Sequence, residues 1–242
     1  MTPLDLARVE TLWVYLAADP LLWLTVTLIA YVAADRISAA LGRHPLANPV
    51  LIAVAFLAAI LLATKTPFET YFQGAQFVHF LLGPATVALA LPLHRHWPIV
   101  RKAALPILAA LLAGAVTAVV SAVGIAALFG APYPVLAALA PKSVTAAIAM
   151  GVARGIGGEP SLTATLVIAT GILGAVMVTP LMVLFRFTDW RARGFAAGLA
   201  AHGIGTARAF QVDPVAGAFA GIAMGLNGLV TAALVPLILT LF

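Results

Sequence analysis

The sequence contains no cysteine and very few charged residues. Without cysteine, disulfides, thiol nucleophiles and thiolate metal sites are excluded. Only 9% of the 242 residues are charged, against roughly 25% in typical soluble domains. Because 63% of the residues are hydrophobic, the apolar surface exceeds what one water-soluble core can bury, and the composition indicates a membrane protein.

The apolar runs are continuous and lack the alternation of an outer-membrane barrel, so helices are the remaining way to satisfy the backbone in lipid. A spanning helix needs roughly 20 apolar residues, which leaves room for about seven to nine spans. We therefore predict an all-α, polytopic transmembrane protein with a single membrane domain, 1–242. The expected spans number about eight and cover 12–35, 46–64, 76–93, 103–130, 134–153, 161–185, 192–210 and 214–241.

The net charge of +5 resides mainly in short stretches between the apolar runs. Such a distribution is typical of membrane orientation rather than of nucleic-acid binding, so we expect no nucleic-acid partner. The first ten residues lack the pattern of a cleavable signal, and the first apolar run is expected to be a retained span. These features predict a multi-pass protein of the cytoplasmic (inner) membrane.

Two short segments of the sequence resemble later segments at one constant offset, a similarity called here the internal echo. Leu82–Val87 aligns with Leu139–Val144 at an offset of 57 residues, and Pro49 aligns with Pro106 at the same offset. The echo indicates either two pseudo-repeat halves, about 1–130 and 131–242, or chance in an alanine-rich chain. Internal repeats with proline-interrupted, discontinuous helices are typical of secondary transporters.

The segment from Pro141 to Thr145 is a candidate anion site. If a helix begins at Pro141, its free N–H groups and dipole favour an anion. Lys142 then adds a full positive charge, while Ser143 and Thr145 can donate hydrogen bonds. This combination suits a carboxylate. The alternative is that Lys142 only extends to the membrane surface at the end of a span.

A second candidate is the glycine-rich segment that carries His202, Thr206 and Arg208. His202 and Thr206 share one helical face, and histidine can exchange a proton near neutral pH. Arg208 can bind a carboxylate with two N–H groups. Alternatively, His202 is a hydrogen-bonded packing residue and Arg208 belongs to the loop before Asp213.

Asn227 lies deep in the last apolar run and needs a partner in another helix or a ligand. The Asn227–Gly228 step is expected to break this span. In the first half, Gly83–Thr86 is another candidate break, which would direct Thr86 toward the same site. Apart from Asp19 and Asp35 in the first expected span, with Asp35 at its end, no Asp or Glu lies inside an expected span, which favours an anion site over a cation exchanger.

We expect no cofactor and no metal. Ser143 has no evident local base, so we also expect no catalytic residue and no enzymatic activity.

Several motifs in the same order resemble the LrgB/CidB family over about 46–240. They are NPVL at 48–51, LLGPATVALALPL at 81–93, PKSVT at 141–145, GGEPSLTA at 157–164, TGILGA at 170–175, HGIGTARA at 202–209 and GAFAGIAMGLNG at 217–228. The sequence departs from relatives at Thr179–Pro180, where Gly-Pro is common. Members of this family are described as antiholin-like effectors of murein hydrolase activity and cell lysis. The plant plastid relative is a glycolate/glycerate transporter, and bacterial relatives are tied to pyruvate movement with a small LrgA/CidA partner.

Two functional hypotheses follow. The first is a proton-coupled transporter of small monocarboxylates such as pyruvate, glycolate or glycerate, which works by alternating access. Lys142 or Arg208 would neutralise the charge of the substrate, and His202 would carry the proton. Hydroxyl and amide side chains would orient the substrate, namely those of Thr86, Ser143, Thr145, Thr206 and Asn227. The second is a non-transporting, antiholin-like effector that assembles with a small LrgA/CidA-type membrane protein. A homo-oligomer in the bilayer is expected in either case.

Overall fold

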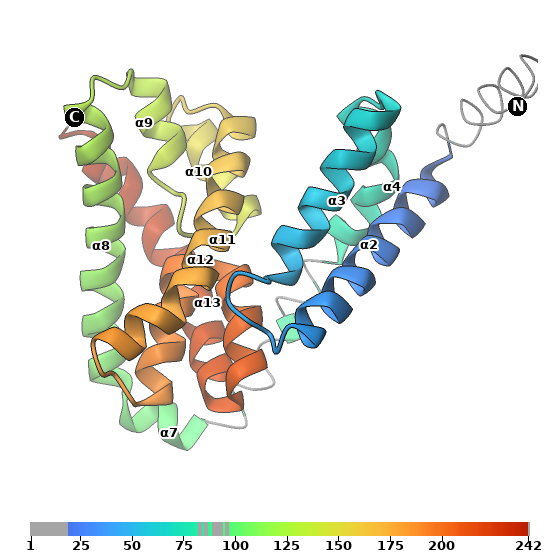
Figure 1. The fold of residues 1–242 in the computed structure, drawn as a ribbon. Coiled ribbons are helices and arrows are strands. Elements are labelled where there is room, and N and C mark those ends of the chain that lie inside the picture. Colours follow the sequence, from blue (N-terminus) through green and yellow to red (C-terminus); the bar gives the residue numbers. More distant parts are fainter. Residues whose placement is uncertain (1–18, 82–83, 85–86, 89–93, 95–96, 242) are drawn as a thin grey trace, which may run out of the picture. The chain divides into compact units, whose positions relative to one another are not determined.

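The computed structural model describes residues 19–81, 84, 87–88, 94 and 97–241, and in these residues all regular secondary structure is helical (Figure 1). The chain divides into two compact units, Met1–Ala88 and Leu89–Phe242, each of which is described by itself. The boundary differs from the one expected near residue 130, and the proposed pseudo-repeat stays a prediction.

Four helices begin with the same local signal, an acidic or amide residue followed by proline. The preceding side chain accepts hydrogen bonds from the first backbone N–H groups of the helix, and proline loses no bond at this position. These helices are α2 (Pro20–Ala40), α3 (Pro49–Thr64), α11 (Pro160–Leu184) and α13 (Pro214–Leu239), after Asp19, Asn48, Glu159 and Asp213. The starts of α3, α11 and α13 lie within a few residues of the expected ones.

Unit 1 consists of α2, α3 and α4 (Phe68–Phe80). Gly74 of α4 lies directly against α2, where the Pro20 carbonyl occupies the space that a side chain would need. The edge of the Trp23 ring meets Tyr71 at a centroid distance of 5.9 Å. Most of the expected span 76–93, with Thr86, lies outside the described residues.

Unit 2 contains α7 (Trp97–Lys102), α8 (Ala104–Leu128), α9 (Tyr133–Leu139), α10 (Ala146–Gly155), α11, α12 (Trp190–Val212) and α13. Among the described residues, α2, α8, α11 and α13 are long and apolar enough to cross a bilayer. An exposed stripe of leucine and valine along α8, which includes Leu108, Leu112 and Val116, suits contact with lipid. The chain is a multi-pass membrane protein, although this structure does not confirm eight spans.

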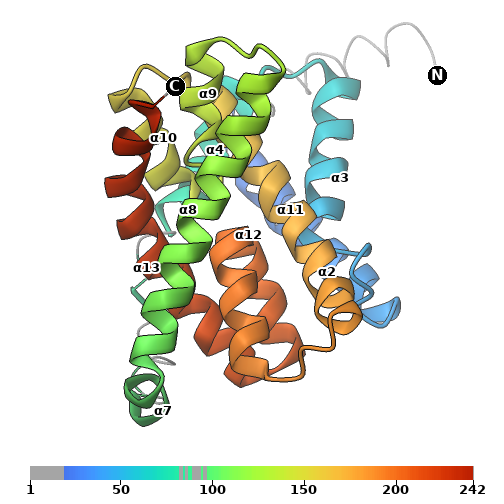
Figure 2. The same cartoon turned by 90° about the vertical axis from the view of Figure 1, so that its left-hand side faces the viewer.

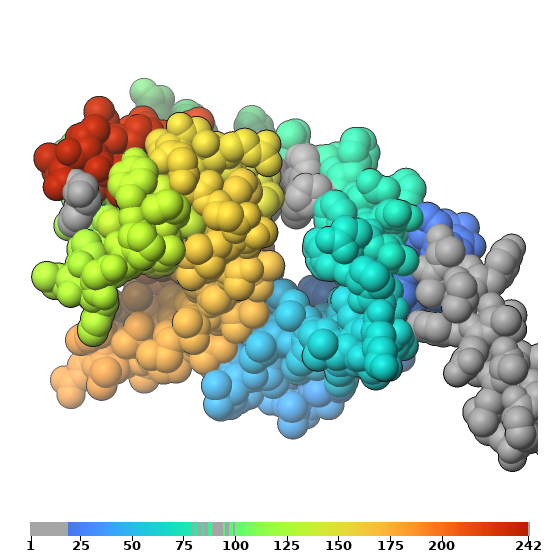
Figure 3. All heavy atoms as spheres, turned by 90° about the horizontal axis from the view of Figure 1, so that it is seen from above, coloured from blue at the N-terminus to red at the C-terminus, as the bar shows by residue number. Residues whose placement is uncertain are grey.

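The expected single span 134–153 is wrong, because α9 and α10 form a helical hairpin. Gly158, just after α10, packs so closely on α9 that an added Cβ would lie 2.7 Å from the Ala138 nitrogen. Leu136 of α9 and Val152 of α10 share one apolar cluster, which also contains the end of α13. Figure 3 shows the end of α13 (red) beside α9 (green) and α10 (yellow). The chain thus returns to the side from which it entered, and 140–145 forms the tip.

The expected span 192–210 is also a hairpin. The helical angles of α12 are interrupted at Ala201 and at His202, where φ is +40°. Gly205 packs against Ala197, whereas these residues would lie about 12 Å apart along a straight helix. The two legs therefore lie side by side, with their tip at Ala201–His202.

The two hairpins enter unit 2 from opposite ends. Helix α11 connects them and has 25 residues, or about 37 Å, which exceeds the roughly 30 Å of a bilayer core. Figure 2 shows α9 and α10 in the upper part of unit 2 and α12 in the lower part. The tips therefore meet in its middle.

Helix α13 passes both hairpins without interruption, so the expected break at Asn227–Gly228 is wrong. Gly228 has a tertiary role instead, because an added Cβ would lie 2.7 Å from Cδ1 of Ile148 in α10. Gly194 and Gly198 of α12 bring that helix against the backbone of α13 at Ala216 and Ala220. Small residues thus set the distance between α12 and α13.

Replacing Gly198 with alanine should destabilise the protein by about 1–3 kcal/mol, since the Ala220 carbonyl occupies the space of the new methyl group. Gly225→Ala in α13 is the matched control, because nothing lies within 4 Å of its added Cβ. Thermal unfolding in detergent should show a lower Tm for Gly198→Ala and an unchanged or higher Tm for Gly225→Ala. Equal Tm values for the two variants would contradict the close packing of α12 on α13.

Candidate functional site

One buried side chain connects the two hairpin tips. The Asn227 amide nitrogen donates to the carbonyl oxygens of Leu199, at 3.1 Å, and Ser143, at 3.4 Å. Its amide oxygen accepts from the Thr231 hydroxyl at 3.1 Å, and both Asn227 and Thr231 are fully buried. Because a hydroxyl donates to the amide oxygen, the amide nitrogen is directed at the two tips.

A cavity of about 520 Å³ lies beside this junction. Its volume falls in the range of small-molecule sites, about 300–1,000 Å³. The lining residues come from α8 and from the two hairpins: Ala113, Gly114, Thr117, Ala118, Lys142, Ser143, Leu199 and Ala200. Lys142 and Ser143 of the sequence prediction thus share one cavity, which is otherwise lined mainly by small and apolar side chains.

Two polar groups of the first tip, at the edge of this cavity, have no polar partner among the described residues. Ser143 is 2% exposed, and within the described part of the chain its hydroxyl has no hydrogen-bond partner. Lys142 is half-buried and forms no ion pair with any described residue. A cation and an unpartnered hydroxyl at the same tip suit an anion that accepts hydrogen bonds.

The helix start expected at Pro141 is wrong. The N–H groups of Lys142 and Val144 donate to the carbonyls of Leu139 and Pro141 in successive turns, so they are not free for a ligand. Helix α10 begins only at Ala146, after Thr145, whose side chain makes no capping hydrogen bond. The first turn of α10 therefore keeps N–H groups without a side-chain cap, and its dipole favours negative charge at that end.

His202 and Thr206 stabilise the second hairpin through hydrogen bonds. Neither residue lines the cavity. The His202 Nε2 donates to the Val167 carbonyl of α11 at 3.0 Å, since a carbonyl can only accept. Because Gly171 has no side chain, the His202 imidazole can occupy the space where a Cβ of residue 171 would lie. The Thr206 hydroxyl donates to the His202 carbonyl at 2.8 Å.

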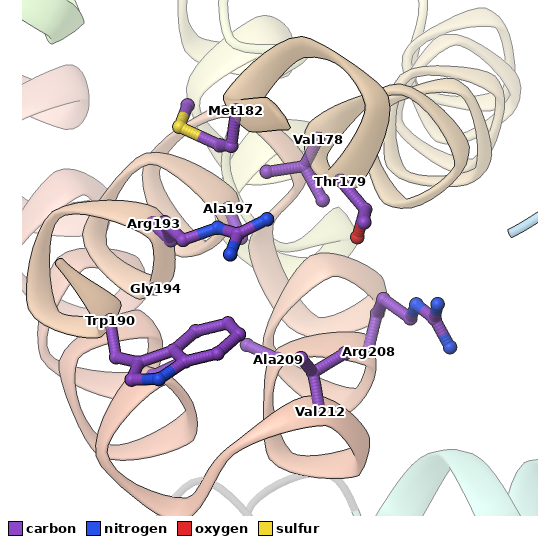
Figure 4. A pocket seen from close by; sticks show the side chains of 11 residues that line it. Val178, Thr179, Met182, Trp190, Arg193, Gly194, Ala197, Arg208, Ala209 and Val212 are labelled. Atoms are coloured by element: carbon purple, nitrogen blue, oxygen red, sulfur yellow. The ribbon is translucent and has the colours of Figure 1, made fainter. Parts of the chain in front are cut away.

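Arg208 is not brought to the tips. It lies on the second leg of α12 and lines a separate recess with Trp190 and Arg193. Figure 4 shows the Arg193 guanidinium extending across this recess and the Arg208 side chain pointing away from it. The Arg193 guanidinium lies 4.5 Å from the centre of the Trp190 ring. Arg208 and Lys142 therefore line different recesses, and the expectation that Arg208 neutralises the substrate stays a prediction.

Sequence reasoning missed six of the eight residues that line the cavity, among them Gly114, Thr117 and Leu199. Thr117 is surrounded in the sequence by alanine and valine, and a threonine in an apolar helix commonly bonds to its own backbone. Only the distance between α8 and α12 reveals its position. No motif in the sequence distinguishes Leu199 from other apolar residues.

Asn227→Asp should destabilise the protein by about 2–4 kcal/mol, because a protonated carboxyl can donate to only one of the two tip carbonyls and a carboxylate to neither. Thr231→Val is the matched control, since it removes only the bond that orients the amide, worth about 1 kcal/mol. Thermal unfolding of both variants in detergent tests this difference. A smaller loss for Asn227→Asp than for Thr231→Val would contradict the bridging role.

The model of the LrgB-like family matches residues 27–241. An uncharacterised protein of Bacillus subtilis, YwbG, is 34% identical over 217 residues, which cover 90% of this chain and 96% of YwbG. The holin-like protein CidB of Staphylococcus epidermidis is 30% identical over 221 residues, or 91% of this chain and 96% of CidB. No solved structure matches.

The matched region includes unit 2 up to residue 241, with both hairpins and Asn227. The chain belongs to the LrgB-like family.

Proposed function

We propose that this protein is a secondary transporter of small monocarboxylates, such as pyruvate, glycolate or glycerate, in the cytoplasmic membrane. The observation that carries the proposal is the cavity at the junction of the two hairpin tips, where Lys142 lies beside the unpartnered hydroxyl of Ser143. The carboxylate of the substrate would pair with the ammonium and accept a hydrogen bond from the hydroxyl. The same bonds would compensate for the cost of a charged group inside the membrane.

The hairpins suit alternating access. Because they approach the junction from opposite ends, movement of either hairpin would open the cavity toward one side while the other stays closed. Asn227 donates hydrogen bonds to carbonyls of both tips. Breaking one of these two bonds would allow one hairpin to move while the other stays bound. Transport therefore needs no covalent chemistry, and no enzymatic activity is proposed.

The second candidate is an antiholin-like effector of murein hydrolase activity and cell lysis, favoured by the name of the holin-like relative CidB. It would act by assembling with a small LrgA/CidA-type membrane protein, and both functions are compatible with a homo-oligomer. Cells that produce a transport-deficient protein separate the two candidates. An unchanged effect on lysis supports the effector, and a loss of the effect together with transport supports the transporter.

Lys142→Met should abolish transport, since it keeps the length of the side chain and removes the charge that pairs with the carboxylate. Uptake of labelled pyruvate, glycolate and glycerate into proteoliposomes should fall at least tenfold, or about 1.4 kcal/mol. Lys102→Met, at the exposed end of α7, is the control and should transport normally. Undiminished uptake by a folded Lys142→Met protein, or no uptake of any of these acids by the unmodified protein, would contradict the proposal.

His202 is the proposed proton carrier. Because Nε2 is bonded to Val167, the proton would be taken at Nδ1. His202→Gln should still be able to donate a hydrogen bond to Val167 but cannot titrate, so it should retain exchange of substrate between equal concentrations and lose the response to a pH gradient. His202→Ala, which loses both functions, should lower stability as well. A normal response of His202→Gln to the gradient would exclude coupling through this residue.

A further inference from the structure

A second cavity, of about 510 Å³, lies between α8 and the first leg of α12, and we call it the lateral groove. Small apolar residues of both helices form its walls: Pro106, Ala110 and Gly114 of α8, and Ala192 and Ala196 of α12. Its only charged lining residues are Asp189 and Arg191, at the start of α12. Because Pro106, Ala110 and Ala192 are exposed, the groove is open along its side to the surroundings of unit 2.

The lateral groove has the length of one lipid leaflet. Along α8 its lining extends from Ala103 to Gly114, or about 16 Å, and half of a bilayer core is about 15 Å. Its inner end shares Gly114 and Ala200 with the cavity at the hairpin tips, in the middle of unit 2. A cavity of this volume spread over this length is too narrow for an α-helix, which is about 10–12 Å across with its side chains. A single hydrocarbon chain fits these dimensions.

The outer end of the lateral groove is basic. Arg191 lines the groove at this end, and α7 ends with Arg101 and Lys102 directly before α8. Val100 of α7 and Phe195 of α12 belong to one apolar cluster, so α7 and the start of α12 lie at the same end of unit 2 (Figure 2). Three cationic side chains therefore gather where the groove begins.

The acidic side chains at this end already have partners. Asp189 forms an ion pair with Arg191 at 2.6 Å, and Asp213 accepts hydrogen bonds from the first N–H groups of α13. Arg101 and Lys102 form no ion pair with any residue in the part of the chain that the structure describes. The outer end of the groove thus keeps an excess of positive charge, which suits an anionic group.

Two tryptophans indicate the depth of this end in the membrane. Trp97 begins α7 and Trp190 begins α12, and both side chains are exposed. Exposed tryptophan is enriched where a membrane meets water, at the level of the lipid headgroups. The basic end of the lateral groove therefore lies at headgroup level, and its apolar walls extend from there into the hydrocarbon core.

We propose that the lateral groove binds an anionic phospholipid, with one acyl chain between α8 and α12 and the phosphate at the basic end. The chain would contact the alanine and proline walls along the depth of one leaflet. The phosphate would accept hydrogen bonds from the Arg191 guanidinium and pair with Arg101 and Lys102. Basic pockets between membrane helices bind anionic headgroups in this way. A zwitterionic lipid with the same chains would gain less, because it carries no net charge.

Native mass spectrometry of the detergent-solubilised protein tests the headgroup site through the affinity for the first bound lipid. Dioleoyl phosphatidylglycerol is the anionic probe and dioleoyl phosphatidylcholine the zwitterionic one. Arg191→Gln should weaken phosphatidylglycerol binding about fivefold, as expected for one cation near an anionic headgroup, and leave phosphatidylcholine binding unchanged. Arg154→Gln, at the exposed end of α10 on the opposite side of unit 2, is the matched control and should keep both affinities.

The same measurement tests the site of the acyl chain. Ala110→Phe places a ring in the lateral groove and should weaken the binding of both lipids about tenfold, which corresponds to the loss of roughly two buried CH₂ groups. Ala109→Phe is the matched control, because Ala109 is the exposed neighbour of Ala110 on α8 and does not line the groove. Ala196→Phe fills the groove from α12 and provides a second variant if Ala110→Phe does not fold.

Three results would overturn the lipid site. Equal lipid affinities of Ala110→Phe and Ala109→Phe would exclude an acyl chain in the groove, and a full preference for phosphatidylglycerol in Arg191→Gln would exclude the headgroup site. Release of the bound lipid by an equal concentration of inorganic phosphate would indicate a site for free anions instead. A loss of oligomers in Ala110→Phe with unchanged lipid affinity would assign the groove to contact between copies of the chain. None of these measurements needs a transport substrate, so their outcome is independent of the proposed function.

Discussion

The interior of a bilayer offers no water to the backbone groups that an interrupted helix exposes, so each of these groups needs a partner in the protein. In its described residues, unit 2 has two such interruptions, at 140–145 and at Ala201–His202. The Asn227 amide donates to carbonyls at both, and Thr231 directs the amide. One buried side chain on an unbroken helix therefore stabilises two broken ones and determines where they meet.

Small residues make this junction possible. The glycines of α12 let its first leg approach the backbone of α13, and Gly171 lets the His202 ring reach the Val167 carbonyl. His202 has a positive φ, which costs of order 1–3 kcal/mol, and its hydrogen bond to α11 offsets part of this cost. Lys142 reaches the cavity from the other hairpin without an acidic partner among the described residues. The junction thus combines two tip carbonyls that are hydrogen-bonded to Asn227 with a lysine charge that no described acidic residue neutralises.

The sequence predicted the helices that depend on local signals. An acidic or amide residue before proline marks the starts of α3, α11 and α13, and the apolar runs indicate a helical membrane protein. The sequence analysis also proposed Lys142, Ser143 and Asn227 as parts of one site, and their proximity is seen only in the structure. The hairpins were missed as such, because an apolar run that turns back has the same composition as one that crosses.

Arg208 shows the consequence of that limit. It is close to His202 in sequence, but the chain reverses between the legs of α12 and directs the two residues to different surroundings. The predicted helix start at Pro141 is wrong for a related reason. The N–H groups of Lys142 and Val144, which a helix beginning at Pro141 would leave free, donate hydrogen bonds in local turns. Thr117 and Leu199 depend on the packing of α8 against α12, for which the sequence contains no local signal.

The central claim is that a carboxylate binds between the hairpin tips at Lys142. The most direct measurement is the solid-state NMR distance between the carboxylate carbon of ¹³C-labelled pyruvate and ¹⁵N-labelled lysine side chains in the membrane-embedded protein, which has only three lysines. We predict dipolar coupling at a distance of about 4–5 Å, as expected for a contact ion pair, and its loss in Lys142→Arg. Coupling that persists in Lys142→Arg, or no coupling at saturating pyruvate, would contradict the claim.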